Sequence, residues 1–183
     1  MRGSALDRGE SIGLTFGIDK QPRERTEFMT TDTTPKDVVR RYFEALANGD
    51  RATIVDSWAE DGSCWYGGDL PISGTWQGRD QVIDGFLATA FTYFDPDHEV
   101  GLRVTNIFGE GDQVFAEWDS WGLGKTGRVY DQKNSAVFVV RDNKIVTMRE
   151  YADTQNWERA LVDTGSGAQL GPASVEAAMI GGK

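Results

Sequence analysis

Apolar side chains recur at helical spacing in three segments between residues 34 and 94. The first helix is expected to begin after Thr34 and to end at Gly49, and Pro35 with Asp37 completes a helix-start signal of the capping-box type. The apolar face of this helix consists of Val38, Val39, Tyr42, Phe43 and Leu46. These positions lie three or four residues apart, which predicts an amphipathic helix packed on a core.

Two further helices follow. The second is capped by Asp50, and its apolar positions run to Trp58 and Ala59, so we expect it to end near residue 60. The third is predicted over residues 79–94. Its wide apolar stripe is suited to packing against a sheet and comprises Val82, Ile83, Phe86, Leu87, Ala90, Phe91 and Phe94.

The rest of the chain alternates as strands do. Short strands are predicted at residues 63–66 and 74–77, and longer ones at 99–108, 113–123, 128–140 and 144–153, with a closing helical turn at 154–162. Asp142 and Asn143 suit a two-residue hairpin turn. The order of elements predicts an α+β domain, in which a curved, mixed or antiparallel sheet wraps over three N-terminal helices and leaves a cleft between the layers.

Composition narrows the classes of function. Residues 1–33 and 163–183 are predicted to be flexible tails around one domain at 34–162. The net charge of −10 disfavours nucleic acid and anionic membrane surfaces as partners. No long apolar run or secretory signal is present, which favours the cytoplasm. With one cysteine, Cys64, and one histidine, His98, neither an internal disulfide nor a metal site is expected.

Two stretches resemble known families. Residues 38–46, VVRRYFEAL, followed by Asn48-Gly49-Asp50, resemble the first helix of ketosteroid isomerases. Residues 144–153, KIVTMREYAD, resemble the last strand of SnoaL-like polyketide cyclases. Over residues 34–162 the chain is thus similar to the nuclear transport factor 2-like superfamily. The resemblance implies a cone-shaped, cystatin-like fold with an apolar pocket, and a homodimer formed through the outer sheet face.

The same resemblance suggests catalytic roles. Tyr42 falls where the isomerases keep a tyrosine that donates a hydrogen bond to the developing oxyanion, and Glu150 falls where the cyclases keep an acid/base aspartate. Tyr66 takes the place of the isomerase's basic aspartate. Ala136 takes the place of the isomerase's second acid and of the cyclase's histidine. In an apolar pocket the charged form of Glu150 is disfavoured, so its pKa is expected to rise toward the working pH.

Asp119 is a third candidate for catalysis. It shares one face of its strand with Glu117, and a carboxylate pair enters the pocket if that face is concave. The alternation is equally compatible with an inward set of Val114, Ala116 and Trp118, so both readings stay open. The predicted substrate-binding residues are mainly aromatic, and such side chains either pack the core or give a planar guest flat walls. They are Trp58, Tyr66, Phe86, Trp121, Tyr130, Asn134 and Met148.

The leading hypothesis is an enzyme that moves protons on an apolar, carbonyl-containing metabolite, of cyclase, isomerase or dehydratase type, without a cofactor. A non-catalytic binder of an apolar small molecule is the first alternative, because two catalytic positions of the isomerases are not met. A dimerisation module whose own side chains fill the pocket is another. An epoxide hydrolase would need an Asp-Arg-Asp arrangement, for which Asp119, Arg149 and Asp153 are the available residues.

Overall fold

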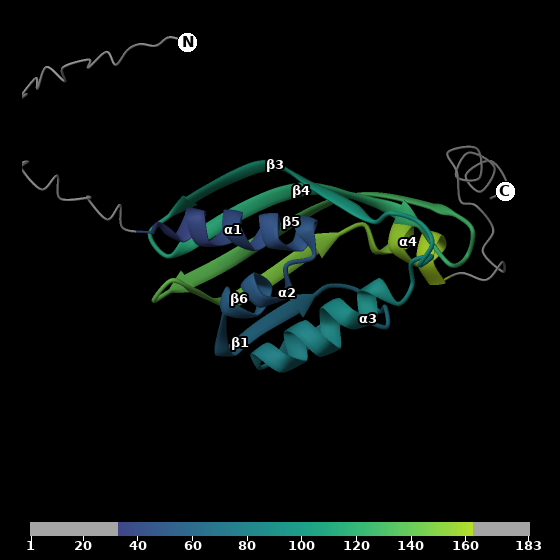
Figure 1. The fold of residues 1–183 in the computed structure, drawn as a ribbon. Helices are drawn as coiled ribbons and strands as arrows, with labels where there is room; N and C mark the ends of the chain where they lie inside the picture. Colours follow the sequence, from purple (N-terminus) through teal and green to yellow (C-terminus); the bar gives the residue numbers. More distant parts are fainter. Residues whose placement is uncertain (1–32, 163–183) are drawn as a thin grey trace, which may run out of the picture. The chain divides into compact units, whose positions relative to one another are not determined.

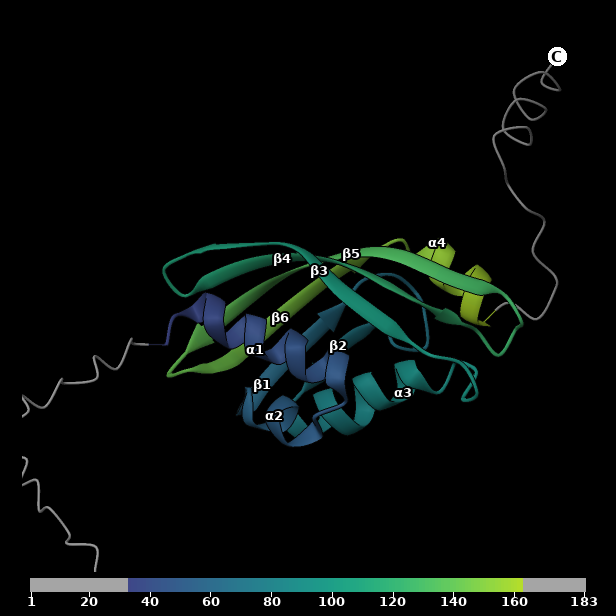
Figure 2. The same ribbon diagram turned by 45° about the horizontal axis from the view of Figure 1, so that its top comes forward.

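A computed structural model describes residues 33–162, and the two predicted tails lie outside these residues apart from Thr33. Six strands form one curved sheet with helices on one side of it, as Figure 1 and Figure 2 show. The α+β class and the sheet wrapped over N-terminal helices are therefore confirmed. None of the helices in the described part is long and apolar enough to cross a lipid bilayer.

Helix α1 spans Pro35–Asn48 and begins at the predicted capping box. The Thr34 hydroxyl accepts from the Asp37 backbone N–H at 3.3 Å, and the Asp37 carboxylate accepts from the Thr34 N–H at 3.1 Å. Gly49 ends the helix with a φ of 66°, a left-handed conformation that favours glycine. The apolar face that the sequence predicts is the buried one, so α1 presents Tyr42 and Phe43 to the interior.

The second helix is shorter than predicted. Asp50 caps α2, Arg51–Asp56, as expected, but strand β1, Trp58–Tyr66, begins where the helix was predicted to continue. The reason is tertiary: the Ile145 N–H donates to the Ser57 carbonyl at 2.8 Å, and Trp58 aligns with Ile145. Pairing with a distant strand satisfies this backbone, and the Trp58 side chain is fully buried there.

The third helix runs from residue 79 to Phe91, three residues short of the prediction. Its central part, η1 (Gln81–Leu87), is a π-helix, and α3 (Ala88–Phe91) continues it. Strand β2, Gly74–Gln77, lies where it was predicted and runs close to this helix. A Cβ atom on Gly85 would meet the Trp76 ring at 2.7 Å, so this approach requires glycine.

Four long strands complete the sheet: β3 (Gly101–Glu110), β4 (Gln113–Leu123), β5 (Val129–Arg141) and β6 (Lys144–Ala152). The order is β2-β1-β6-β5-β4-β3, and the β1–β6 pair is parallel, so the sheet is mixed. The predicted turn at Asp142-Asn143 has φ values of 49° and 59°. Asp153 caps α4 (Thr154–Trp157), and η2 (Glu158–Val162) follows, so the predicted closing helical turn at 154–162 is present.

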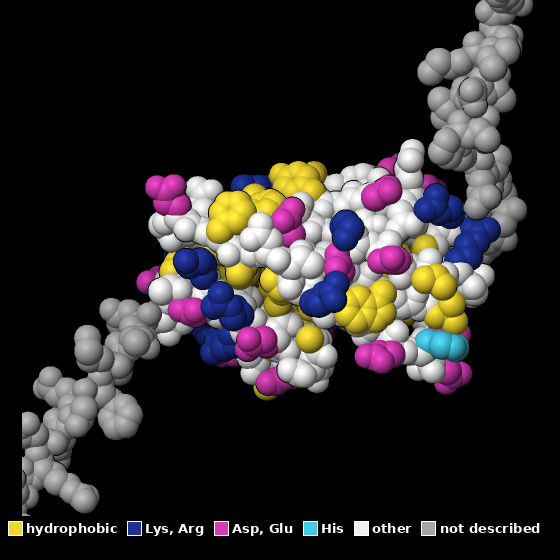
Figure 3. Space-filling view, turned by 90° about the horizontal axis from the view of Figure 1, so that it is seen from above, with side chains coloured by type: hydrophobic (Ala, Val, Ile, Leu, Met, Phe, Trp, Pro, Cys, Tyr) yellow, Lys and Arg dark blue, Asp and Glu magenta, His cyan; other side chains and the backbone are white. Residues whose placement is uncertain are grey.

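The structure decides which face of β4 is inward. Val114, Ala116 and Trp118 are buried on the helix-covered face, whereas Glu117 and Trp121 are exposed on the other. Figure 3 shows the molecule from above relative to Figure 1, with hydrophobic side chains between charges of both signs. The His98 side chain is 57% exposed, and its Nδ1 lies 3.2 Å from a carboxylate oxygen of Asp95.

Candidate functional site

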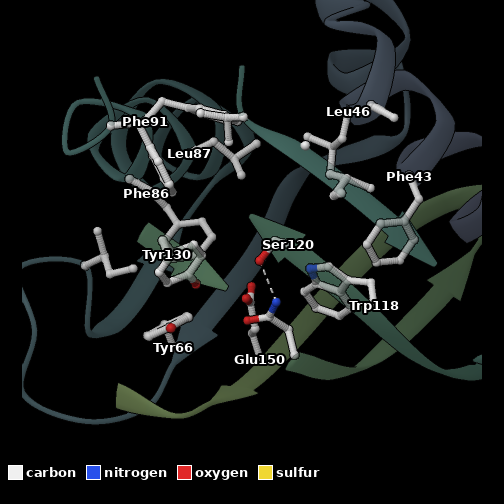
Figure 4. A pocket seen from close by; sticks show the side chains of 18 of the residues that line it. Phe43, Leu46, Tyr66, Phe86, Leu87, Phe91, Trp118, Ser120, Tyr130 and Glu150 are labelled. Atoms are coloured by element: carbon white, nitrogen blue, oxygen red, sulfur yellow. Dashed lines mark hydrogen bonds between the residues drawn. The ribbon is translucent and has the colours of Figure 1, made fainter. Parts of the chain in front are cut away.

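A cavity of about 160 Å³ lies between the sheet and the helices. Figure 4 shows Phe43 and Leu46 of α1 on one side and Phe86, Leu87 and Phe91 of the third helix on the other. The inner face of the sheet closes it from below. Its lining on that side comprises Tyr66, Trp118, Ser120, Tyr130, Asn134, Met148 and Glu150. Most of the lining is apolar, and the polar groups gather on the sheet.

Glu150 is the carboxyl group of this cavity. It lies on β6, aligned with Tyr66 of β1 on one side and with Ala136 of β5 on the other. Its side chain is half-buried because it lines the cavity, and no partner within residues 33–162 forms a hydrogen bond or ion pair with it. Burial without a partner raises the pKa of Glu150 to about 8, which makes it a proton donor and acceptor near neutral pH.

Three phenols and one thiol surround this carboxyl. Burial raises the pKa of Tyr42, Tyr66, Tyr130 and Cys64 well above their ordinary values, and the charge of Glu150 raises each further. The phenols therefore keep their protons at neutral pH and remain hydrogen-bond donors. A carboxyl that exchanges its proton, beside donors that do not, is suited to proton transfer next to an oxygen that develops charge.

Tyr42 reaches the cavity from α1. Its side chain is 1% exposed, and its ring packs edge-on against Trp58 at 5.9 Å and against Phe138 at 6.2 Å. Two core aromatics thus hold the phenol in place while it lines the cavity. The isomerase resemblance predicts an oxyanion donor at this residue, and the structure places the residue in the cavity lining.

The remaining polar groups belong to β1, β4 and β5. The Asn134 amide donates to the Ser120 hydroxyl at 2.8 Å, drawn as a dashed line in Figure 4. Ser120 in turn interacts with Tyr130 and lowers its pKa against the effect of burial. Tyr66 differs, because its hydroxyl is buried and has no hydrogen-bond partner among the residues that the structure describes.

Most of the predicted site residues come together. The cavity is lined by Tyr42, Glu150, Tyr66, Phe86, Tyr130, Asn134 and Met148. Three predictions are wrong. Trp58 is fully buried and packs behind Tyr42 without reaching the cavity. Trp121 lies on the outer face, 40% exposed, over Gly101.

Asp119 is the third wrong prediction. It points to the outer face, where its carboxylate accepts from Arg103 at 2.8 Å and from Lys133 at 3.0 Å. Both cations hold its pKa below the ordinary value, Arg103 most strongly. The arrangement expected of an epoxide hydrolase also fails, because Arg149 is exposed and Asp153 caps a helix, and neither lines the cavity.

Sequence reasoning missed several lining residues. Trp118 and Ser120 follow from the inward face of β4, which the alternation left undecided. Phe43, Leu46, Leu87 and Phe91 were predicted as core-facing helical positions, and nothing in the pattern distinguishes a core wall from a cavity wall. Within residues 33–162 no three His, Cys, Asp or Glu side chains gather as a metal site would require.

The SnoaL-like domain matches residues 39–148, more than half of the chain. The chain belongs to the SnoaL-like domain family. It is also 29% identical over 125 residues to uncharacterised proteins of Mycobacterium tuberculosis H37Rv and Mycobacterium bovis, covering 67% of this chain and 92% of each relative.

Solved structures share the fold. A nuclear transport factor 2-like protein of Burkholderia thailandensis has a TM-score of 0.64 at 20% identity, covering 71% of this chain and 98% of its own. A Jannaschia protein described as a SnoaL-like polyketide cyclase has a TM-score of 0.60 at 20% identity, covering 82% and 100%. TerC, co-crystallised with polyporic acid, has a TM-score of 0.63 at 17% identity, covering 71% and 100%. The SnoaL-like domain therefore has the nuclear transport factor 2-like fold here.

Proposed function

We propose that this SnoaL-like protein is a cofactor-independent enzyme that transfers a proton on an apolar, carbonyl-containing metabolite, of the polyketide-like kind. One observation carries the proposal: the Glu150 carboxyl lines an apolar cavity with no cation paired to it among residues 33–162, and burial alone raises its pKa to about 8. An acid/base group works best when its pKa lies near the working pH. A carboxylate kept only for stability would be expected to have a paired charge.

The chemistry needs no group beyond the chain's own side chains. Ionised Glu150 removes a proton from the carbon next to the carbonyl, and the C–H electron pair moves into the carbonyl to give an enolate. Tyr42 donates a hydrogen bond to the enolate oxygen, the role that the isomerase resemblance assigns to it. Neutral Glu150 then returns the proton to carbon, or delivers it as a ring closes.

Two proteins of similar structure support a substrate of the polyketide-like kind. One similar structure is described as a polyketide cyclase, and TerC was co-crystallised with polyporic acid. The cavity is close in size to engineered apolar cavities of about 150 Å³ that accept benzene. We therefore expect a guest whose buried part is about one ring in size.

The test uses acetophenone as a one-ring ketone probe. Deuterium uptake into its methyl group is followed by NMR in D₂O at a pD near 8, with the wild type and Glu150→Gln. Loss of the acid/base should lower the protein-dependent rate by about 10²-fold or more. Glu44→Gln, on the exposed side of α1, is the matched control and should leave the rate unchanged. An equal rate in wild type and Glu150→Gln rejects the assignment.

A non-catalytic binder is the second candidate, and the phenol at Tyr66 and the methyl at Ala136, in place of isomerase catalytic groups, favour it. Mass spectrometry of material extracted from the purified protein would then find a copurified guest, with no exchange of any ketone. The open cavity supports either candidate over a dimerisation module filled by its own side chains.

Two further expectations belong to the same proposal. We expect the protein to lie in the cytoplasm, because the reducing conditions there keep a free cysteine such as the buried Cys64 reduced. Homodimer formation stays a prediction, and exposed aromatic side chains such as Trp65, Trp121 and Tyr151 are available on the outer sheet face. Light scattering of the purified full chain measures the oligomeric state directly.

A further inference from the structure

Tyr66 stands directly beside Glu150. The two residues are aligned across the parallel β1–β6 pair, so their side chains leave the same face of the sheet from neighbouring strands. On the other side of Glu150 the aligned residue is Ala136, which is fully buried and does not line the cavity. The row across the sheet therefore presents a phenol and a carboxyl side by side toward the cavity.

The Tyr66 hydroxyl lacks a hydrogen-bond partner. The residue is 2% exposed, it lines the cavity, and no group of residues 33–162 lies within hydrogen-bonding reach of its oxygen. Buried polar groups are almost always paired, so a buried hydroxyl left unpaired points to a partner that arrives from outside. Tyr66 and Glu150 line the same cavity, so a guest bound there is the nearest candidate for this partner.

The neighbours of the other two phenols act on them differently. Trp58 lies next to Tyr42, and Ser120 next to Tyr130, and each neighbour acts to lower the pKa of its phenol. Every group that acts on Tyr66 raises its pKa instead. Among the three phenols of the cavity, within residues 33–162, Tyr66 is the one whose hydroxyl oxygen is both fully buried and without a hydrogen-bond partner. The Phe86 ring, 5.7 Å away, packs against the Tyr66 ring and limits its movement.

We propose that Tyr66 is the anchoring donor of the cavity: its hydroxyl donates a hydrogen bond to the carbonyl oxygen of a neutral, one-ring guest. The carbon next to that carbonyl then lies beside the Glu150 carboxyl, because phenol and carboxyl project from adjacent strands. The anchored class comprises aryl ketones, cyclic ketones and quinones, whereas hydrocarbons of the same size lack the acceptor. The anchoring role of Tyr66 depends on one part of the proposed function, which is that a carbonyl-containing guest occupies the cavity.

The experiment compares acetophenone with α-methylstyrene, which replaces the carbonyl oxygen by a CH₂ group and keeps the shape. Affinities are measured by tryptophan fluorescence, and the carbonyl stretch of bound acetophenone by infrared difference spectroscopy. The wild type should bind acetophenone about tenfold more tightly than α-methylstyrene and lower its carbonyl frequency relative to an apolar solvent. In Tyr66→Phe both the preference and the shift should disappear.

Tyr151→Phe makes the same chemical change on the outer face and should keep both signals. The melting temperature gives an independent readout: removal of an unpaired hydroxyl should leave the unliganded protein as stable as the wild type or more stable. A lower melting temperature in Tyr66→Phe, or a carbonyl shift that persists there and is lost in Tyr42→Phe, overturns the anchoring role. So does equal binding of the two probes by the wild type, or no binding of either.

The two proposals fail in different ways. If the carbonyl shift depends on Tyr66 but the protein exchanges no deuterium, the anchoring role of Tyr66 is kept and the enzyme proposal is rejected. If instead deuterium exchange depends on Glu150 and the carbonyl shift is unchanged in Tyr66→Phe, the enzyme proposal is kept and the anchoring role of Tyr66 is rejected.

Discussion

The two faces of the sheet treat a carboxylate in opposite ways. Asp119, on the outer face of β4, sits between Arg103 and Lys133, which hold its pKa below the ordinary value. Glu150, on the inner face of β6, is paired with no cation of the part of the chain that the structure describes, and burial raises its pKa to about 8. At neutral pH the first is a fixed charge, and the second is a group that can take up or release a proton.

The difference shows that residue type alone does not make a catalytic carboxyl. Both residues come from strands of one sheet, and both were candidates from the sequence, Asp119 by the alternating pattern and Glu150 by the family resemblance. Only the face decides whether solvent and cations stabilise the charge, or whether an apolar wall opposes it. Substituting one carboxyl at a time measures how strongly the two faces differ.

The largest expected effect is on deuterium exchange into acetophenone. Glu150→Gln should lose about 10²-fold, whereas Asp119→Asn, which makes the same kind of change on the outer face, should stay within twofold of the wild type. The comparison fails if the two variants lose activity equally.

The pH dependence of the same reaction comes next. The base has to be ionised, and with a pKa of about 8 only about one tenth of Glu150 is ionised at pH 7. After subtraction of the Glu150→Gln background, the exchange rate should rise about tenfold per pH unit below pH 8 and level off above it. A plateau that already begins near pH 5 would mean an ordinary, solvated carboxyl.

Stability should change with pH in a related way. The native protein holds the Glu150 proton between the ordinary pKa of 4.5 and about 8, whereas the unfolded chain has released it. The free energy of unfolding of the wild type, compared with Glu150→Gln, should therefore fall by about 1.4 kcal/mol per pH unit in this window and stay constant above it. Urea unfolding at pH 5, 6.5 and 8 measures the slope, and Glu44→Gln should follow the wild type.

The smallest effect is expected on the outer face. Arg103 and Lys133 are 71% and 87% exposed, so water and salt screen their pairs with Asp119. Asp119→Asn should lower the melting temperature only slightly at low ionic strength and not at all in 1 M NaCl. A large, salt-independent loss would show that Asp119 is more than a surface charge.

Local signals predicted much of the fold. The capping box at Thr34, the turn at Asp142-Asn143 and the alternation along β4 to β6 set the elements nearly where the structure has them. The main error was at Trp58, where an apolar residue at helical spacing belongs to a strand. Over a segment as short as the one around Trp58, the same apolar positions fit a helix and a strand, and pairing with Ile145 decides for the strand.

The site was predicted only in part, for the same kind of reason. Tyr42 and Glu150 came from family resemblance, and the aromatic walls at Phe86 and Tyr130 from composition. Asp119 and Trp121 failed because a period of two defines two faces without saying which one is inward. Their chain neighbours Trp118 and Ser120 line the cavity instead, where Asp119 and Trp121 were predicted to lie.

By itself the sequence determined the order of helices and strands, the family, and the presence of a carboxyl at position 150, because propensity, capping and periodicity act over a few neighbouring residues. The tertiary structure alone placed Tyr66 beside Glu150, since a parallel pair joins strands from opposite ends of the domain. It also left that phenol unpaired and that carboxyl without a cation. Register and burial are set by the whole sheet and the helices on it, and no local stretch of residues encodes them.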